Sequence, residues 1–397
     1  DLPAGQSSGA ELSAAMSIPM HIRALAALAA LSLLAGCASR PEVGALADNM
    51  AVAPGATDHS IMVATSRARD PRPGTYFNGE RSTAFDLAEF TVSVPPNHKH
   101  GEVELPQSGA GNPQTDFVVR DGGYIENEKA FVAQLNRRLA QKPRGQRSII
   151  IFIHGYNTLF AEGLYRFAQV VHDSKSTAVP VHFSWASRGQ LSDYVYDNNS
   201  ATAARDRLER LFRLALASNA EKVNVLAHSM GNWVTVEAMR QMKIKGGVPH
   251  PEKIGTIMLA APDIDIDVFK SQMRAIGDPK KPFFVILSRD DRALALSRYL
   301  AGDKSRVGDT PDTQELTALG AVVIDLTDVK GQDSMNHDKF AEIANAAPEL
   351  RSVLAKGVGR PRGALGDAVA GTAAAGLTVT AVPLQILSAP IRILAGE

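Results

Sequence analysis

The stretch Val223-Asn-Val-Leu-Ala-His-Ser-Met-Gly-Asn-Trp-Val234 decides the fold of the chain. An apolar, valine-containing run leads into Ala227-His-Ser-Met-Gly231, and residues 232–242 continue with helical spacing. A strand, a sharp turn that carries a serine between two small residues, and a helix together form a nucleophile elbow. The small residues let strand and helix pass closely, although the first is alanine where glycine is usual. The pattern predicts that the turn lifts the Ser229 hydroxyl above the sheet, where the helix N-terminus faces developing negative charge.

The composition is that of an ordinary globular protein. The chain has 397 residues, of which 45% are hydrophobic and 21% charged, and this is enough for one large domain with appendages. The formal net charge is +0, which argues against nucleic acid as a partner. A single cysteine, Cys37, excludes an internal disulfide and a cysteine-rich zinc site.

A secretory signal is predicted near the N-terminus. Residues 1–15 contain no methionine and look like translated upstream sequence, so we expect the signal to start at Met16 or Met20. Arg23 supplies its positive charge, and residues 24–33 form an Ala/Leu-rich run. This run is too short to span a bilayer, which favours a signal peptide over an anchor helix.

The end of this signal resembles a bacterial lipobox. Leu34-Ala-Gly-Cys37 is followed by Ala38, and cleavage before the cysteine would leave Cys37 as the lipid-bearing residue. A plain signal peptide with a chance cysteine is the alternative. Ala38 stands where aspartate would favour the inner membrane, so we expect a lipid anchor in the outer membrane, with the protein facing the periplasm. Residues 1–36 are then the upstream segment and signal, and residues 37–59, rich in Ala, Gly and Pro, a linker.

Short apolar strands alternate with helical segments along the middle of the chain. This alternation predicts an α/β domain over residues 60–350, with a doubly wound, mostly parallel sheet and helices on both of its faces. Residues 104–123 are expected to be mostly loop. We expect strands at residues 61–65, 85–94, 148–153, 179–185, 223–226, 254–259, 283–287 and 321–326, and helices at 126–141, 162–172, 203–218, 232–242 and 338–346.

Residues 351–397 form an apolar C-terminal tail. Residues 368–391 carry no charge, and their length of about 20 residues raises the question of a transmembrane helix. Pro383 and Pro390 interrupt this segment, and it is only mildly hydrophobic. We therefore expect it to pack on the domain or to lie on the membrane rather than to span it.

A serine nucleophile needs a base, and the base needs an orienting carboxylate. Without them the elbow would be a strand-to-helix turn with an incidental serine. In a sheet of this kind the acid and the histidine follow the serine along the chain. Of the ten histidines only His250 and His337 come after Ser229. His250 directly precedes a strand, at the sheet edge away from the serine, whereas His337 follows the last strand. His337 is therefore the predicted base.

Three carboxylates are candidates for the acid. An apolar strand ends at Leu287, and Asp291 lies four residues beyond it, within reach of a histidine on the following loop. Asp291 is the predicted acid, with its neighbour Asp290 as an alternative. Asp263 is a further alternative, in a run of alternating aspartates that lacks the glycine and distal glutamate of a calcium loop and is typical of a helix N-cap.

An oxyanion hole needs two backbone donors. The amide of Met230, directly after the nucleophile, is the predicted first donor. The second is expected from Gly155 and Tyr156, because His-Gly after an early buried strand resembles the arrangement in lipases and esterases. His98 and His100 stand in a Pro/Gly-containing loop without a nearby third ligand. The sequence therefore predicts no metal and no other cofactor.

Six stretches in fixed order carry a resemblance to a known family: Val63-Ala-Thr-Ser-Arg67, Phe152-Ile-His-Gly-Tyr-Asn157, Phe183-Ser-Trp-Ala-Ser187, Leu226-Ala-His-Ser-Met-Gly-Asn232, Ala261-Pro-Asp-Ile-Asp265 and Ser288-Arg-Asp-Asp-Arg-Ala-Leu294. The chain resembles the α/β-hydrolase superfamily and, more narrowly, a bacterial esterase/lipase-like group called DUF900. The resemblance covers about residues 60–350. It implies the hydrolase fold and a triad of Ser229, Asp291 and His337. It implies no substrate, because this family has none securely assigned.

The sequence thus predicts a lipid-anchored serine hydrolase of carboxylic esters in the bacterial cell envelope. An acyltransferase with the same triad is one alternative, and a catalytically inactive envelope-binding lipoprotein is another. The expected partners are a small-molecule or lipid ester and the membrane.

Overall fold

The computed structural model describes residues 40–41, 43–277, 283–329, 331, 333, 335–340 and 392–394, the last three by their backbone alone. The described residues from Pro41 onward form one compact unit. The signal peptide, Cys37, the predicted helix after Phe340 and nearly all of the C-terminal tail lie outside the described residues.

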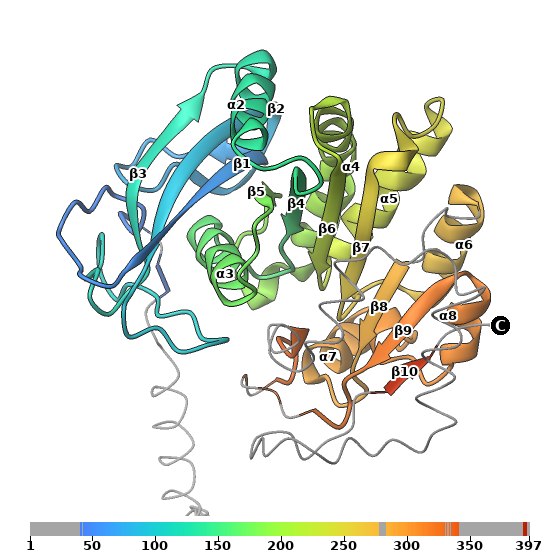
Figure 1. Ribbon diagram of the computed structural model, residues 1–397. Coiled ribbons are helices and arrows are strands. Elements are labelled where there is room, and N and C mark those ends of the chain that lie inside the picture. The colour runs from blue at the N-terminus through green and yellow to red at the C-terminus, as the bar shows by residue number, and fades with distance from the viewer. Residues whose placement is uncertain are drawn as a thin grey trace, which may run out of the picture. The chain divides into compact units, whose positions relative to one another are not determined.

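Ten strands of the described chain form one sheet, in the order β10-β9-β8-β7-β6-β4-β5-β1-β2-β3 (Figure 1). Strands β1 and β4 to β9 run parallel to one another, whereas β2 pairs antiparallel with β1, β3 with β2, and β10 with β9. The predicted doubly wound, mostly parallel sheet is therefore confirmed. The strands are β1 (Thr57–Arg69), β2 (Phe77–Val94), β3 (Val118–Ile125), β4 (Ser148–Ile153), β5 (Val179–Ser184), β6 (Lys222–His228), β7 (Ile254–Ala260), β8 (Phe283–Leu287), β9 (Ala321–Asp325) and β10 (Arg392–Leu394).

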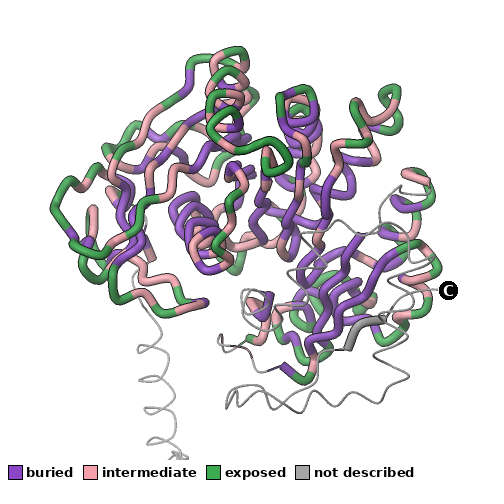
Figure 2. The backbone as a smooth tube through the Cα atoms, viewed as in Figure 1, coloured by how far each residue is buried: buried purple, intermediate pink, exposed green. Residues whose placement is uncertain are grey.

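Helices cover both faces of this sheet, as expected. Strand side chains alternate between two hydrophobic clusters: Val225 and Ala227 belong to one and Leu226 to the other. The first cluster includes residues of α2, α4, α5, α6 and α8, and the second includes α3. Figure 2 shows strands β8 and β9 buried along their whole length. The helices are α2 (Glu128–Ala140), α3 (Phe160–Asp173), α4 (Tyr194–Ala217), α5 (Gly231–Ile244), α6 (Ile266–Ile276), α7 (Arg292–Leu300) and α8 (Thr313–Ala318).

The strand order reverses at β4. The chain passes from β4 to β5 on one side and then returns to place β6 on the other side. Ligands of open α/β sheets bind at such a switch point, in the crevice at the carboxyl ends of the strands. The segment after β4, which begins with His154, and the turn after β6, which holds Ser229, both leave the sheet at this point.

The structure differs from the sequence-based expectations at the sheet edge and before it. Strand β3 occupies residues that were expected to be mostly loop, and β2 begins eight residues before the predicted start. Gly122 weakens the strand signal of β3, but the ring of Phe90 covers it so closely that a Cβ there would lie 2.7 Å from the ring. The segment predicted as a linker also packs on the domain, since Ala45 and Leu46 are buried.

Candidate active site

Ser229 occupies a strained turn between β6 and α5. Its φ of +53° lies in the left-handed region, which costs a residue with a side chain free energy unless its surroundings hold it. The Ser229 amide donates to the Ala260 carbonyl at 3.0 Å. The side-chain amide of Asn232 donates at 2.8 Å to the carbonyls of both Ser229 and Ala260. These bonds fix the predicted elbow, and the serine keeps only 5% of its surface exposed.

Different surroundings explain the two small residues on either side of the serine. A Cβ on Gly231 would lie 2.4 Å from the carbonyl oxygen of His154, so no larger residue fits there without moving the backbone. Ala227 is fully buried in β6, where it pairs with Ile153 and Leu259. The turn thus accommodates the methyl group at the position where the elbow pattern usually has glycine.

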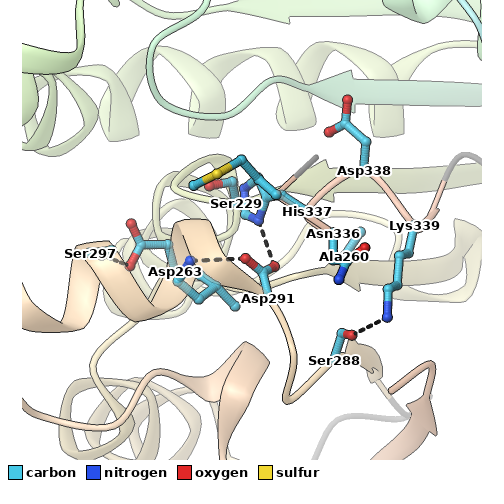
Figure 3. Close-up of polar contacts among 12 residues, drawn as sticks. Ser229, Ala260, Asp263, Ser288, Asp291, Ser297, Asn336, His337, Asp338 and Lys339 are labelled. Carbon is cyan, nitrogen blue, oxygen red and sulfur yellow. Dashed lines mark hydrogen bonds and ion pairs between the residues drawn. The ribbon is translucent and has the colours of Figure 1, made fainter. Parts of the chain in front are cut away.

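His337 and Asp291 form a short hydrogen bond. His337 Nδ1 lies 2.6 Å from Asp291 Oδ2, and the Asp291 side chain is fully buried. The other carboxylate oxygen, Oδ1, accepts from the Leu294 amide at 2.9 Å and so caps α7. The His337 ring also lies 4.6 Å from the ring of His228, the residue before Ser229. The structure therefore places the His337–Asp291 pair against the residue that precedes Ser229, at the carboxyl edge of the sheet (Figure 3).

The charge balance around His337 favours its protonated form. Burial acts against the imidazolium, but the hydrogen bond and charge of Asp291 outweigh it. Asp338 and Asp263 add to this effect, and together they raise the pKa of His337 to about 8. The free ring is therefore mostly protonated at neutral pH, and the neutral form that can accept a proton increases as the pH rises through about 8.

Asp333 shapes the loop that presents His337, which comprises residues 335–340 and is called the His337 loop below. Its carboxylate accepts backbone amides from Met335 at 3.1 Å, His337 at 3.0 Å and Asp338 at 3.1 Å. The sequence analysis gave Asp333 no role. An aspartate two residues before the amide it binds is typical of an Asx turn, and this was the available signal.

Asp290 anchors the same loop and does not bind the histidine ring. Its Oδ1 lies 2.6 Å from Lys339 Nζ, and its Oδ2 accepts from the Asn336 side chain at 3.0 Å. Lys339 is only 2% exposed and also donates to the carbonyls of Leu326 and Thr327, so its charge is well satisfied. Asp290, the alternative acid, thus holds the His337 loop in place.

Asp263 belongs to a separate buried group. Its carboxylate lies 3.2 Å from Arg306 Nε and accepts from the hydroxyls of Ser297 at 2.5 Å and Tyr194 at 3.3 Å. Burial raises the pKa of Asp263, and Arg306 is the main group that opposes this. Of the three candidate carboxylates, Asp291 is the one bonded to the His337 ring.

The segment after β4 lies against the serine. A Cβ on Gly155 would be 2.7 Å from the Ser229 Cβ, so the backbone at Gly155 approaches the nucleophile as closely as glycine permits. Trp185 Nε1 donates to the His154 carbonyl at 2.8 Å and holds the start of this segment. Met230, directly after the serine, is buried and is the N-cap of α5.

Comparison with known families agrees with this fold. The model of the family described as an alpha/beta hydrolase of unknown function (DUF900) matches residues 127–354, which is more than half of the chain. The chain belongs to this family. The matched segment contains β4 to β9 and each of the residues placed around Ser229 above. This match shows that the chain is an α/β hydrolase.

Comparisons with individual proteins add little to this DUF900 assignment. No curated protein matches the chain. One similar solved structure comes from a study of two fungal esterases from Rhizomucor miehei that explains their substrate specificity. It shares 14% sequence identity, covers 86% of this chain and 94% of that chain, and has a TM-score of 0.29. This score is too low to support a conclusion about the DUF900 protein.

One arginine outside the matched DUF900 segment organises the residues after β4. The Arg67 guanidinium is fully buried, and burial lowers its pKa to about 10, so it stays charged at neutral pH. This side chain ties β1 and β5 to the His154 segment. Its nitrogens lie within hydrogen-bond distance of Ser184 Oγ (2.8 Å), Ser187 O (2.7 Å), Asn78 O (3.1 Å), Thr158 O (2.7 Å) and His154 Nε2 (3.4 Å).

The described part of the DUF900 protein offers neither a metal-binding cluster nor a membrane-spanning helix. No group of three or more histidines, cysteines, aspartates and glutamates among the described residues could hold a metal ion. No helix within those residues has the length and apolar character needed to cross a membrane.

Proposed function

We propose that the protein is a serine-dependent hydrolase of carboxylic esters. The observation that carries the proposal is the 2.6 Å bond between His337 and Asp291 beside a serine held in a left-handed turn. This is the arrangement that a serine nucleophile, its base and the orienting acid require. Membership of the α/β hydrolases is consistent with the proposal but does not by itself name the reaction.

The proposed reaction is acyl transfer to water. Because Asp291 engages Nδ1 of His337, the imidazole presents Nε2 as the proton acceptor. His337 takes the proton of Ser229 as the serine oxygen attacks the ester carbonyl, and returns it to the departing alcohol. A water molecule, activated by the same ring, then releases the acyl group. Asp291 fixes the tautomer and stabilises the imidazolium. The proposal requires no metal or organic cofactor.

Backbone amides are proposed to bind the oxyanion. Met230 directly follows the nucleophile at the start of α5, where helix amides face outward and the dipole favours negative charge. The Gly155–Tyr156 backbone supplies the second donor on the other side. Gly155 supports this role because its backbone lies against Ser229. Donors fixed in advance at this place stabilise the tetrahedral intermediate.

The protein is further proposed to be anchored in the cell envelope by a lipid on Cys37, in the outer membrane and facing the periplasm. Pro41, the first residue of the compact unit, is only four residues from Cys37, so the chain between them spans at most about 14 Å. Such a short connection would hold the domain close to the membrane surface. A lipid ester drawn from that membrane would then be within reach of the enzyme.

The function is tested with nitrophenyl esters of increasing acyl length. We expect hydrolysis by the wild type and a loss of about 10⁶-fold in Ser229→Ala. Product analysis with an added alcohol distinguishes hydrolysis from transfer of the acyl group to another hydroxyl. A folded wild type that releases nitrophenol no faster than Ser229→Ala, for every ester tried, would exclude the proposed activity.

A further inference from the structure

We propose that His228 and the ion pair between Arg166 and Asp338 form a bracket that positions the His337 loop against the nucleophile. The inference rests on the proposed function, because it assigns these side chains to the placement of the base. In the sequence His228 appears only as the residue before the serine, and Arg166 and Asp338 carry no motif.

His228 holds the backbone of the catalytic histidine. Its Nε2 lies 3.3 Å from the carbonyl oxygen of His337. A carbonyl oxygen can only accept, so His228 carries its proton on Nε2 and donates it. The two imidazole rings lie 4.6 Å apart, and the Phe340 ring packs 4.5 Å from His228. His228 therefore contacts the His337 loop at two places.

The same side chain faces the segment after β4. A Cβ on Gly155 would lie 3.2 Å from Nδ1 of His228 and 2.7 Å from the Ser229 side chain. His228 thus lies between the base and one of the proposed oxyanion donors. Its size sets the separation between His337, which must reach the serine hydroxyl, and Gly155, which is proposed to bind the carbonyl oxygen.

His228 remains neutral when His337 becomes charged. Burial lowers the pKa of His228 to about 3, with a contribution from the charge of His337 that Asp338 partly offsets. A second imidazolium beside the first would cost Coulomb energy in a buried site. A neutral donor holds the loop without opposing the proton transfer to His337.

The ion pair holds the opposite side of the loop. Arg166 Nη2 lies 2.9 Å from Asp338 Oδ2, while Asp338 Oδ1 faces His228 Nε2 at 3.6 Å. Asp338 directly follows His337, so its position sets the direction in which the loop leaves the base. Figure 3 shows Asp338 and Lys339 on the segment that continues beyond His337.

Arg166 lies on α3, and further hydrogen bonds hold its side chain in place. Its Nη1 donates to the Gly101 carbonyl at 3.0 Å and to Gln169 Oε1 at 3.1 Å. Gln169 is fully buried and donates onward to Asp173 at 2.6 Å. Residues 166, 169 and 173 have the spacing of one helix face. The bracket is therefore built on a rigid helix that packs against the sheet.

The test compares two substitutions of His228. In His228→Gln the side-chain amide can still donate to the His337 carbonyl, whereas His228→Leu has no donor. We expect kcat for an activated ester to fall at least tenfold in His228→Leu, with KM changed less than twofold, and to be largely restored in His228→Gln. A role in core packing alone would not favour the donor over the apolar residue.

A second comparison uses the charge of Asp338. Asp338→Asn keeps an acceptor for Arg166 but removes a charge that favours protonated His337, so the pH midpoint of kcat/KM should move down. Lys245→Met is the matched control, because Lys245 forms its ion pairs after the far end of α5 and should leave the midpoint unchanged.

Titration of the His337 ring by NMR, in the wild type and each variant, makes the result independent of turnover. An inactive wild type would refute the proposed function, while the titration would still show whether the variants change the His337 environment. The inference is overturned if His228→Leu and His228→Gln have equal kcat, or if Asp338→Asn leaves the His337 midpoint unchanged.

Discussion

The two carboxylate oxygens of Asp291 accept hydrogen bonds from different groups. One oxygen binds His337 and the other caps α7, so the helix end helps to fix the direction of the carboxylate. The order of residues along the chain indicates a carboxylate just after β8 as the partner of His337. It could not separate Asp291 from Asp290, because neighbouring residues differ only in direction, and direction depends on how the strand-to-helix turn folds.

Asp291→Asn should lower kcat/KM by about 10⁴-fold, because the amide holds the wrong tautomer of the base. Asparagine caps a helix as well as aspartate, but it lacks the charge that stabilises protonated His337, so the melting temperature should fall below about pH 6.5 and change little above about pH 9. Ester hydrolysis and thermal unfolding measured on one preparation check both statements. Retention of more than a tenth of the activity would mean that another group orients His337.

Asp263→Asn should lower the stability of the protein but leave most of its activity. Arg306 would lose its buried partner, which costs about 3–5 kcal/mol of unfolding free energy. The protein that remains folded should keep most of its activity per active site, as counted by titration of the serine. An activity loss as large as that of Asp291→Asn, in folded protein, would assign the acid role to Asp263.

The pKa of His337 predicts two pH dependences. The base must be neutral, so kcat/KM should rise about tenfold per pH unit below about 8 and level off above it. The folded pKa is raised from 6.5 to about 8, so the stabilisation is present in full below pH 6.5 and is lost as the pH rises through 8. It amounts to about 2 kcal/mol. A pH–rate profile and denaturant unfolding at several pH values measure the two effects, and a rate that levels off near pH 6 would contradict the first.

At the scale of elements, the elbow and the segment after β4 depend on close backbone contact. Gly155→Ala would place a methyl group 2.7 Å from the Ser229 Cβ, so the nucleophile must move. We expect a loss of about 100-fold in kcat/KM with the fold retained. Gly123→Ala on β3 is the matched control, because no atom lies within 4 Å of its Cβ position. If the two variants had equal activity, Gly155 would have no role in the active site.

The guanidinium of Arg67 links β1, β5 and the His154 segment through its hydrogen-bond donors. Arg67→Lys keeps the charge but cannot reach all the carbonyls that the guanidinium binds, and each buried acceptor left unpaired costs about 1–3 kcal/mol. We expect a clear fall in melting temperature, with activity lost because the His154 segment moves. Arg210→Lys, an exposed ion pair on α4, is the control and should change stability by less than about 0.5 kcal/mol. A melting temperature for Arg67→Lys equal to that of this control would contradict the account.

The elements that were predicted well share one property. Strands β4, β8 and β9 are short, largely apolar and largely buried, so their sequence alone identifies them. Strand β3 carries Gly122, Gly123 and charged residues, and it forms because β2 offers a long edge for pairing. Asp333 and Lys339 could not be assigned either, since their roles exist only after the loop has folded.

At the scale of the molecule, the sheet extends beyond the segment that matches the DUF900 family. Strands β1 to β3 precede residue 127, yet β1 pairs with β5 along Met62–Thr65 and completes the surroundings of Arg67. The switch point between β4 and β6 lies inside the matched segment and collects the candidate site. The earlier strands therefore support the site from outside it.

The proposed lipid anchor predicts where the molecule resides. Replacing Cys37 with serine removes the thiol to which the lipid would be attached, so the protein should move from the membrane fraction to the soluble fraction of the envelope. Fractionation of cells that express either form, together with mass spectrometry of the N-terminus, measures this. Equal membrane retention of Cys37→Ser would mean that another segment holds the protein there.

Covalent labelling with a fluorophosphonate tests the central claim most directly, because the probe reacts with a serine only when its hydroxyl is activated. The wild type, without its signal segment, would be compared with Ser229→Ala and His337→Ala after all three have been shown to be folded. The account predicts labelling of the wild type and none of either variant. A folded wild type that stays unlabelled, or a Ser229→Ala protein that still labels, would contradict it.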